Sequence, residues 1–145
     1  MQTRFKMKQV QPAAYKPLLE LENYLETTSI APIHQEFIRI RASQINGCAY
    51  CVNNHSEDAH KAGETQKRIN LISVWREAGV FTEEEEVILE LTEQVTLISE
   101  AGISDTLYDK ALQVLGEEKT AQVIMAAITI NAWNRIGRGL NMKPL

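Results

Sequence analysis

Apolar residues recur at intervals of three and four along nearly the whole chain, which is the spacing of one face of an α-helix. No Asn-Gly turn joins two runs of alternating apolar and polar residues, so the sequence shows no sign of a β-hairpin. The pattern therefore predicts an all-α fold of about seven helices.

Prolines, glycines and capping residues divide this pattern into its helices. Thr82 and Glu85 form the sequence pattern of a capping box, and the acidic run that begins there suits the positive end of a helix dipole. The first predicted helix begins near Pro12 and Pro17 and ends before Thr27, and the second runs from Pro32 to Asn46-Gly47. The third runs from about 48 to 62, before Gly63, and the fourth ends near Gly79. The last three run from Thr82 through Ile98, from Ser104 to Gly116, and from about 118 to 136.

The last of these helices is apolar over more than one face. It carries Val123, Ile124, Ala127, Ile128 and Trp133. Such a wide apolar surface predicts that the helix is buried in the domain or in a subunit interface.

Composition narrows the class of protein. The chain has 145 residues, 44% of them hydrophobic and 23% charged, and a formal net charge of -4; these values are typical of one globular domain, which we expect to span residues 1–145. No run of Lys or Arg exceeds two residues, which argues against a nucleic-acid partner. Neither an export signal nor a membrane span is evident, so we expect a cytoplasmic protein with no membrane partner.

Both cysteines lie in one short stretch, Gly47 to His55. On a helix, Cys48, Cys51 and His55 would share a face, because residues three and four apart are neighbours there. A cysteine at a helix N-terminus has its thiolate favoured by the helix dipole, and an adjacent histidine can accept the thiol proton. In a cytosolic protein this CxxC spacing indicates redox chemistry or metal binding.

Glu36 is the candidate group that orients His55. If the two helices that meet at Asn46-Gly47 are antiparallel, Glu36 lies about ten residues before the turn and His55 about eight after it. At about 1.5 Å per residue, their depths differ by only about 3 Å. A carboxylate that close could orient the imidazole and stabilise its protonated form.

These positions together resemble a known family. The combined spacing of Glu36, Cys48, Cys51 and His55, followed by Ala59 and Gly63, is similar to that of AhpD-like alkylhydroperoxidases within the carboxymuconolactone decarboxylase superfamily. Residues 41–47 and 131–135 also resemble that family, and the likeness extends from about Leu18 to Ile136.

The resemblance implies an all-helical homo-oligomer, commonly a trimer or hexamer, that acts as a thiol-dependent peroxidase or disulfide reductase. By position, Cys51 would be the peroxidatic thiol that becomes a sulfenic acid, and Cys48 the resolving thiol. Glu36 and His55 would form a proton relay. The partners would be a hydroperoxide and a thiol or dithiol reductant, with no cofactor and no metal.

Tyr50 departs from the family pattern. It stands between the cysteines where well-characterised AhpD enzymes have a histidine, so a phenol replaces part of the relay or lines the pocket. The reductant is therefore not assigned, and coupling to a lipoyl protein or to AhpC is not assumed.

Other interpretations of the motif remain open. The cysteines could be two buried thiols, or they could bind zinc with His55 and a fourth ligand from His60 or Glu36, although structural zinc usually takes paired ligands from two knuckles. The protein could instead be a redox-responsive oligomeric binding protein with little turnover. Lactone decarboxylation is disfavoured, because the superfamily members that perform it lack the dithiol.

Overall fold

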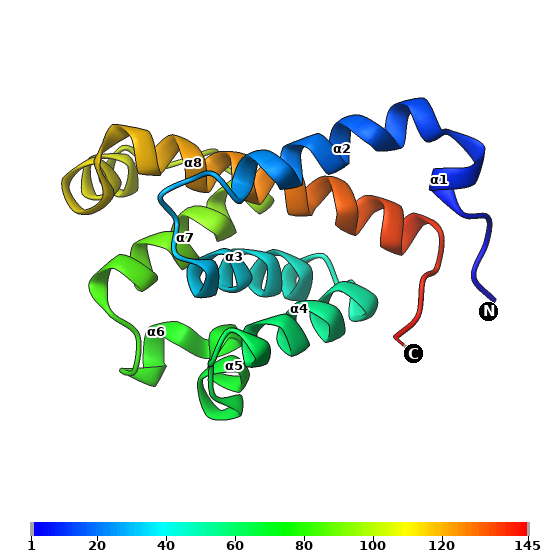
Figure 1. The fold of residues 1–145 in the computed structure, drawn as a ribbon. Coiled ribbons are helices and arrows are strands. Elements are labelled where there is room, and N and C mark those ends of the chain that lie inside the picture. The colour runs from blue at the N-terminus through cyan, green and yellow to red at the C-terminus, as the bar shows by residue number, and fades with distance from the viewer. Residues whose placement is uncertain (1, 145) are drawn as a thin grey trace.

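The structure is a computed structural model that describes residues 2–144, and it is all-helical over that range, as the sequence predicts (Figure 1). Its elements are α1 (Met7–Val10), α2 (Pro12–Leu25), α3 (Pro32–Ile45), α4 (Ala49–Lys61), α5 (Gln66–Leu71), the 3-10 turn η1 (Ile72–Val74), α6 (Trp75–Ala78), α7 (Glu83–Thr96) and α8 (Asp105–Gly139).

Local sequence explains where four of the helices begin. Pro12 and Pro32 stand at the first turns of α2 and α3, and Thr82 and Glu85 form the predicted capping box at the start of α7. Ser104 caps α8, which is interrupted at Gly116, where φ is 77° and ψ is 167°. The two helices predicted on either side of Gly116 therefore follow each other across a kink.

Two predicted boundaries differ from the structure. The single helix expected to end near Gly79 is divided into α5, η1 and α6. The short helix α1 was not predicted at all. Its four residues carry no cap from a side chain and bury none of their own side chains, so no local pattern marks it.

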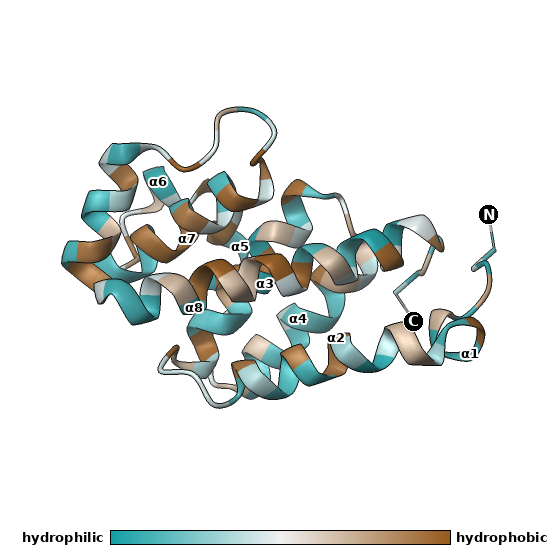
Figure 2. Cartoon of the chain, turned by 90° about the horizontal axis from the view of Figure 1, so that it is seen from above, coloured by the Kyte–Doolittle hydropathy of each residue, from teal (hydrophilic) through white to brown (hydrophobic). Residues whose placement is uncertain are grey.

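Helices α2, α3, α7 and α8 enclose the larger of two hydrophobic clusters, and α8 runs alongside α2 (Figure 1). Hydrophobic residues are concentrated along α7 and α8 where these helices meet (Figure 2). The second cluster lies where α3 faces α4 to α7, and includes Phe37, Ile40, Ala59, Ile72 and Trp75. Since α3 contributes to both clusters, it is fixed on two sides, and it carries Glu36.

A buried carboxylate, Glu93, joins α3, α6 and α7. It accepts hydrogen bonds from Trp75 Nε1 at 2.8 Å, Arg76 at 2.6 Å and Arg41 Nε at 2.7 Å. Burial alone would raise the pKa of this carboxyl, but the three hydrogen bonds and the charge of Arg41 outweigh burial and leave the pKa below its ordinary value of 4.5. Glu93 is therefore charged at neutral pH and holds α3 in place.

No helix within residues 2–144 combines the length and the apolar character needed to cross a lipid bilayer.

Replacing Glu93 by Gln should lower the free energy of unfolding by about 3 kcal/mol at pH 7, because the largely buried guanidinium of Arg41 loses its counter-charge, as does the half-exposed guanidinium of Arg76. The carboxylate has a lowered pKa when folded, so its contribution is complete above pH 4.5 and is lost as the pH falls through the folded pKa. Urea unfolding at several pH values should show the difference between Glu93→Gln and wild type shrinking in acid. Glu90→Gln is the matched control, because Glu90 is half-buried and lies 3.6 Å from Arg76; an equal loss in this variant would contradict the assignment.

Candidate active site

The CxxC pair lies at the N-terminus of α4, as predicted. Cys48 is the residue that caps the helix, Cys51 lies in its first turn, and the two form a disulfide. The backbone N–H of Cys51 also points to Cys48 Sγ, at 3.3 Å. Cys48 is 1% exposed and Cys51 is 5% exposed, so both sulfurs are screened from bulk water.

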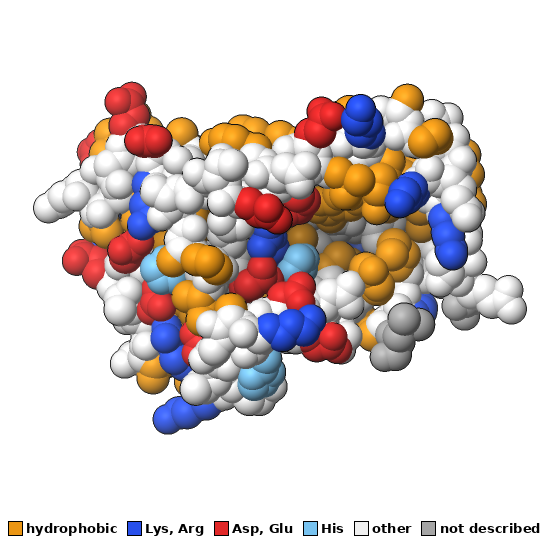
Figure 3. Space-filling view, viewed as in Figure 1, with side chains coloured by type: hydrophobic (Ala, Val, Ile, Leu, Met, Phe, Trp, Pro, Cys, Tyr) orange, Lys and Arg blue, Asp and Glu red, His pale blue; other side chains and the backbone are white. Residues whose placement is uncertain are grey.

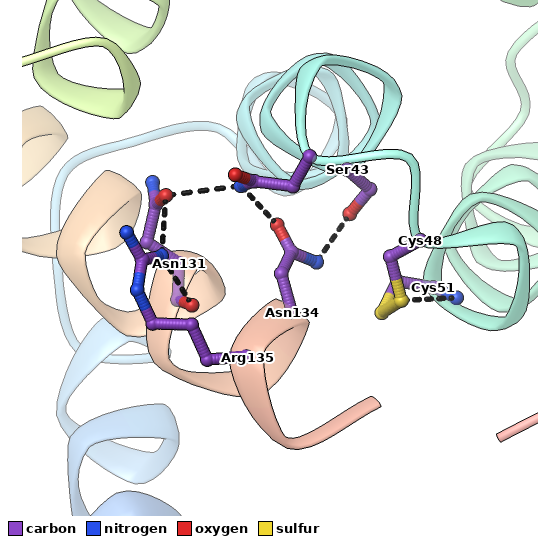
Figure 4. Close-up of a disulfide and its surroundings, with 7 residues drawn as sticks. Ser43, Cys48, Cys51, Asn131, Asn134 and Arg135 are labelled. Atoms are coloured by element: carbon purple, nitrogen blue, oxygen red, sulfur yellow. Dashed lines mark hydrogen bonds between the residues drawn. A yellow bond between two sulfur atoms is a disulfide. The ribbon is translucent and has the colours of Figure 1, made fainter. Parts of the chain in front are cut away.

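The turn before the disulfide is tied to α8 by side-chain amides (Figure 4). Asn46 donates to the side-chain oxygens of Asn131 at 3.0 Å and Asn134 at 2.9 Å. Asn134 in turn donates to Ser43 Oγ at 2.9 Å, and Arg135 donates to both the backbone and side-chain oxygens of Asn131. The two stretches outside the CxxC motif that resemble the family, 41–47 and 131–135, therefore contact each other.

Gly137 brings the backbone of α8 against the disulfide. A Cβ atom built on Gly137 would lie 3.0 Å from Cys48 Sγ and 3.4 Å from Cys51 Sγ. The first distance is tighter than an ordinary van der Waals contact and the second is at its lower edge. A side chain at residue 137 would therefore require α8 or the disulfide to shift by a few tenths of an ångström.

Glu36 and His55 form a hydrogen-bonded pair between α3 and α4. Glu36 Oε2 lies 2.9 Å from His55 Nδ1, and its other oxygen is bound by Arg39. Arg39 also donates to Glu22 of α2, at 2.8 Å. Glu36 is 8% exposed, so the carboxylate that faces His55 is held in place by a cation on its opposite side.

A cavity of about 520 Å³ opens beside this pair, and we call it the Cys51 cavity. The end of the cavity that includes the candidate catalytic residues is formed by side chains of α4: Tyr50, Cys51, Asn54, His55 and Asp58. Its walls come from α2, the end of α8 and the N-terminal segment, residues 2–11. In the space-filling view the cavity is a hollow lined with hydrophobic side chains, with a histidine at one side (Figure 3).

The structure brings most of the predicted site residues together. Glu36 contacts His55, and Tyr50, Cys51 and His55 all line the Cys51 cavity. Cys48 is not among the residues that line it, since it lies behind Cys51. His60, considered as a zinc ligand, bonds to Gln66 at 2.8 Å and lies on a different, shallow cleft. The catalytic roles of these residues stay predictions.

Sequence reasoning missed several residues at this site. Arg39 and Asp58 follow Glu36 and His55 by three positions, so helical spacing could have identified both. Gly137 and the N-terminal segment reach the site only through tertiary contacts, and nothing in their local sequence indicates it.

Glu36, His55 and Asp58 could also hold a metal ion. One ligand atom from each lies within 4.8 Å of the others, and this is the one such group found within the described residues 2–144. Two of the three already have cationic partners, however. Arg39 binds Glu36, and Lys61 Nζ lies 2.7 Å from Asp58. The arrangement therefore fits a hydrogen-bonded relay better than a set of free ligands.

Comparison with known families agrees with this arrangement. Residues 12–94 match the model of the carboxymuconolactone decarboxylase family. The chain belongs to this family. The matched segment runs from α2 into α7, and so it includes Glu36, both cysteines and His55.

Relatives extend the likeness over the whole chain. A protein of unknown function from Agrobacterium tumefaciens, for which the role of antioxidant defence protein AhpD has been suggested, is 35% identical, has a TM-score of 0.95, and each chain covers 99% of the other. YdfG of Bacillus subtilis (strain 168), an uncharacterized protein, is 37% identical over 136 residues, which are 94% of this chain and 92% of YdfG.

A more distant neighbour shows the fold alone. It is a peroxidase-related protein from Ralstonia eutropha JMP134, described as an alkylhydroperoxidase AhpD core, with a TM-score of 0.83 at 14% identity. The superposition covers 96% of this chain and 74% of the neighbour. The recognition of an AhpD-like member of the family is thus confirmed, and the all-α fold with it.

Relative to Gly139→Ala, replacing Gly137 by Ala should destabilise the oxidised protein by about 1–3 kcal/mol, because the new methyl group would lie 3.0 Å from Cys48 Sγ and force α8 or the disulfide to shift. After reduction the sulfurs can rotate apart, so the loss should be smaller. Urea unfolding of both redox forms measures the difference. Gly139→Ala is the matched control, since a Cβ there meets nothing within 4 Å; equal losses in the two redox forms of Gly137→Ala would contradict the prediction.

Proposed function

We propose that this protein is a thiol-dependent peroxidase that reduces hydroperoxides through Cys51. The observation that carries the proposal is the asymmetry of the dithiol: Cys51 lines a cavity together with His55, whereas Cys48 lies behind it and is 1% exposed. A substrate in the cavity meets Cys51 first. Membership of the carboxymuconolactone decarboxylase family and the likeness to a suggested AhpD protein support the same chemistry.

The first step is attack by the Cys51 thiolate. With its Nδ1–H donated to Glu36, His55 has a lone pair on Nε2 and takes the thiol proton. The thiolate attacks the outer peroxide oxygen, so that an S–O bond forms and the O–O bond breaks. Cys51 becomes a sulfenic acid, and the alkoxide that leaves is protonated by His55 to give the alcohol. The Glu36 carboxylate stabilises the imidazolium between these two transfers.

The second step closes the disulfide seen in the structure. The Cys48 thiol attacks the Cys51 sulfur, so that the S–S bond forms and the S–O bond breaks. The departing hydroxide takes the Cys48 proton and leaves as water. An external dithiol then reduces the disulfide and is itself oxidised, which returns both cysteines to thiols.

Turnover of cumene hydroperoxide with dithiothreitol should be abolished in Cys51→Ser and should fall strongly in Cys48→Ser. The two variants should differ in a single turnover. Cys48→Ser keeps the attacking thiol and should consume one equivalent of hydroperoxide, leaving a sulfenic acid that a dimedone probe traps at Cys51. Sustained turnover by Cys51→Ser would refute the assignment of the peroxidatic thiol.

Replacing Glu36 by Gln should lower kcat/KM about 10- to 100-fold, because the imidazolium loses its counter-charge while its hydrogen bond can persist. His55→Gln should cost more, on the order of 10²–10⁴-fold, since the base itself is removed. Initial rates over a range of pH measure both effects. Glu57→Gln on the exposed face of α4 is the control; Glu57 bonds to Asn53 and does not line the Cys51 cavity. A relay role would be ruled out by equal rates in Glu36→Gln and Glu57→Gln.

A redox-responsive oligomer is the second candidate function, and the contact at Gly137 favours it. Both sulfurs lie close to the backbone of α8, a helix that also exposes two large hydrophobic side chains, Tyr108 at 46% and Ile128 at 45%, which a second subunit could contact. We propose a homo-oligomer in either case. Unequal subunit number in the oxidised and reduced protein, together with no hydroperoxide turnover, would select this function over the peroxidase.

A further inference from the structure

The Cys51 cavity is much larger than a peroxide group requires. Its volume is about 520 Å³, within the range of about 300–1,000 Å³ that suits a ligand of drug size. Hydrogen peroxide needs the room of about two water molecules, each with about 30 Å³. Most of the cavity is walled by apolar side chains that take no part in the chemistry: Met7, Tyr15, Leu19, Trp133, Ile136 and Leu140. An organic substituent is needed to fill it.

The charges around the cavity are not balanced. Its acidic residues have cationic partners: Arg39 lies 2.8 Å from Glu22, and Lys61 lies 2.7 Å from Asp58. Lys6 and Lys8 also line the cavity, and within residues 2–144 no carboxylate comes within 4.0 Å of either ammonium group. Basic side chains are visible on the α1 side of the hollow, away from the histidine (Figure 3). This end of the cavity therefore favours an anion, although the whole chain has a net charge of -4.

The two lysines are held at this end by contacts between the two ends of the described chain. The backbone N–H of Arg4 donates to Leu140 O at 2.9 Å, and its guanidinium donates to Gly139 O at 2.8 Å. Asn141 donates to Gln2 O at 3.1 Å. These bonds hold the N-terminal segment beside the end of α8, where it forms one wall of the cavity and contributes Lys6 and Lys8 to the lining.

We propose that the Cys51 cavity takes an amphipathic hydroperoxide with one apolar body and one carboxylate, such as the hydroperoxide of a fatty acid. The hydroperoxy group lies at Cys51 and His55, the apolar body contacts the walls, and the carboxylate pairs with Lys6 and Lys8. This inference rests on the proposed peroxidase function for its reactive group. The recognition of an apolar carboxylate does not depend on that chemistry and can be measured separately.

The kinetic test compares linoleic acid hydroperoxide with its methyl ester, which removes the negative charge and adds only one methyl group. Both are used below the micellar concentration, with dithiothreitol as reductant. Wild type should have the higher kcat/KM for the acid. In the double variant Lys6→Gln/Lys8→Gln, the ratio of acid to ester should fall about three- to tenfold, through KM, because two exposed ion pairs are lost. Added salt should reduce the wild-type ratio in the same direction. Lys16→Gln is the control, since Lys16 is 78% exposed on α2 and does not line the cavity.

The binding test uses decanoate and decan-1-ol, which carry no peroxide, with the fluorescence of the tryptophans as the readout because Trp133 lines the cavity. Wild type should bind decanoate more tightly than the alcohol, and the double variant should lose that preference. If the preference is found and no hydroperoxide is turned over, the proposed function fails and this inference stands for the ligand class. The inference is overturned if hydroperoxides are turned over with equal kcat/KM for acid and ester. It is also overturned if the double variant keeps both the acid-to-ester ratio of kcat/KM and the preference for decanoate over decan-1-ol.

Discussion

The close approach of α8 to the turn that carries the cysteines is the constraint on which the site depends. Gly137 lets the helix backbone touch both sulfurs, and the amides of Asn46, Asn131 and Asn134 fix the distance between α8 and the turn. Neither contact alone would keep the disulfide against α8. Without the amide bonds, the turn would be free to move away from the helix; without the glycine, a side chain on α8 would lie too close to Cys48 Sγ and force a shift. Buried amides of this kind specify one arrangement because each unpaired group would be costly.

The Glu36–His55 pair joins α3 to α4, the helix that also carries the cysteines. Glu36 lies on α3, which packs into two hydrophobic clusters and is further held by the buried carboxylate of Glu93 through Arg41. His55 lies one turn beyond Cys51 on α4. The Glu36–His55 hydrogen bond thus joins two packed helices, and the cysteines lie at the N-terminus of α4, beside the turn that the amides tie to α8.

Sequence patterns predicted the parts of the site that follow from helical geometry. The contact between Glu36 and His55 follows from counting residues on either side of the turn at Asn46-Gly47. In the structure, Glu36 Oε2 and His55 Nδ1 lie 2.9 Å apart. Patterns did not predict what depends on tertiary packing. The helix expected before Gly79 is divided into α5, η1 and α6, and this backbone conformation buries Ile72 and Trp75 in the second cluster. Gly137 lies just beyond residue 136, where the last helix was predicted to end, although α8 continues to Gly139, and the N-terminal segment has no periodicity that would place it beside the cavity.

The wall formed by the N-terminal segment differs in kind from the rest of the cavity. Its bonds to Gly139 and Leu140 close a loop that spans almost the whole chain, since Arg4 and Gly139 are 135 positions apart, and the bond to Gly139 is exposed. Such a closure is opposed by the largest loop entropy in the molecule and gains little from burial. We therefore expect this segment to open more readily, by local unfolding, than the two hydrophobic clusters. One wall of the Cys51 cavity would then open without any movement of the helices that carry Glu36, Cys51 and His55.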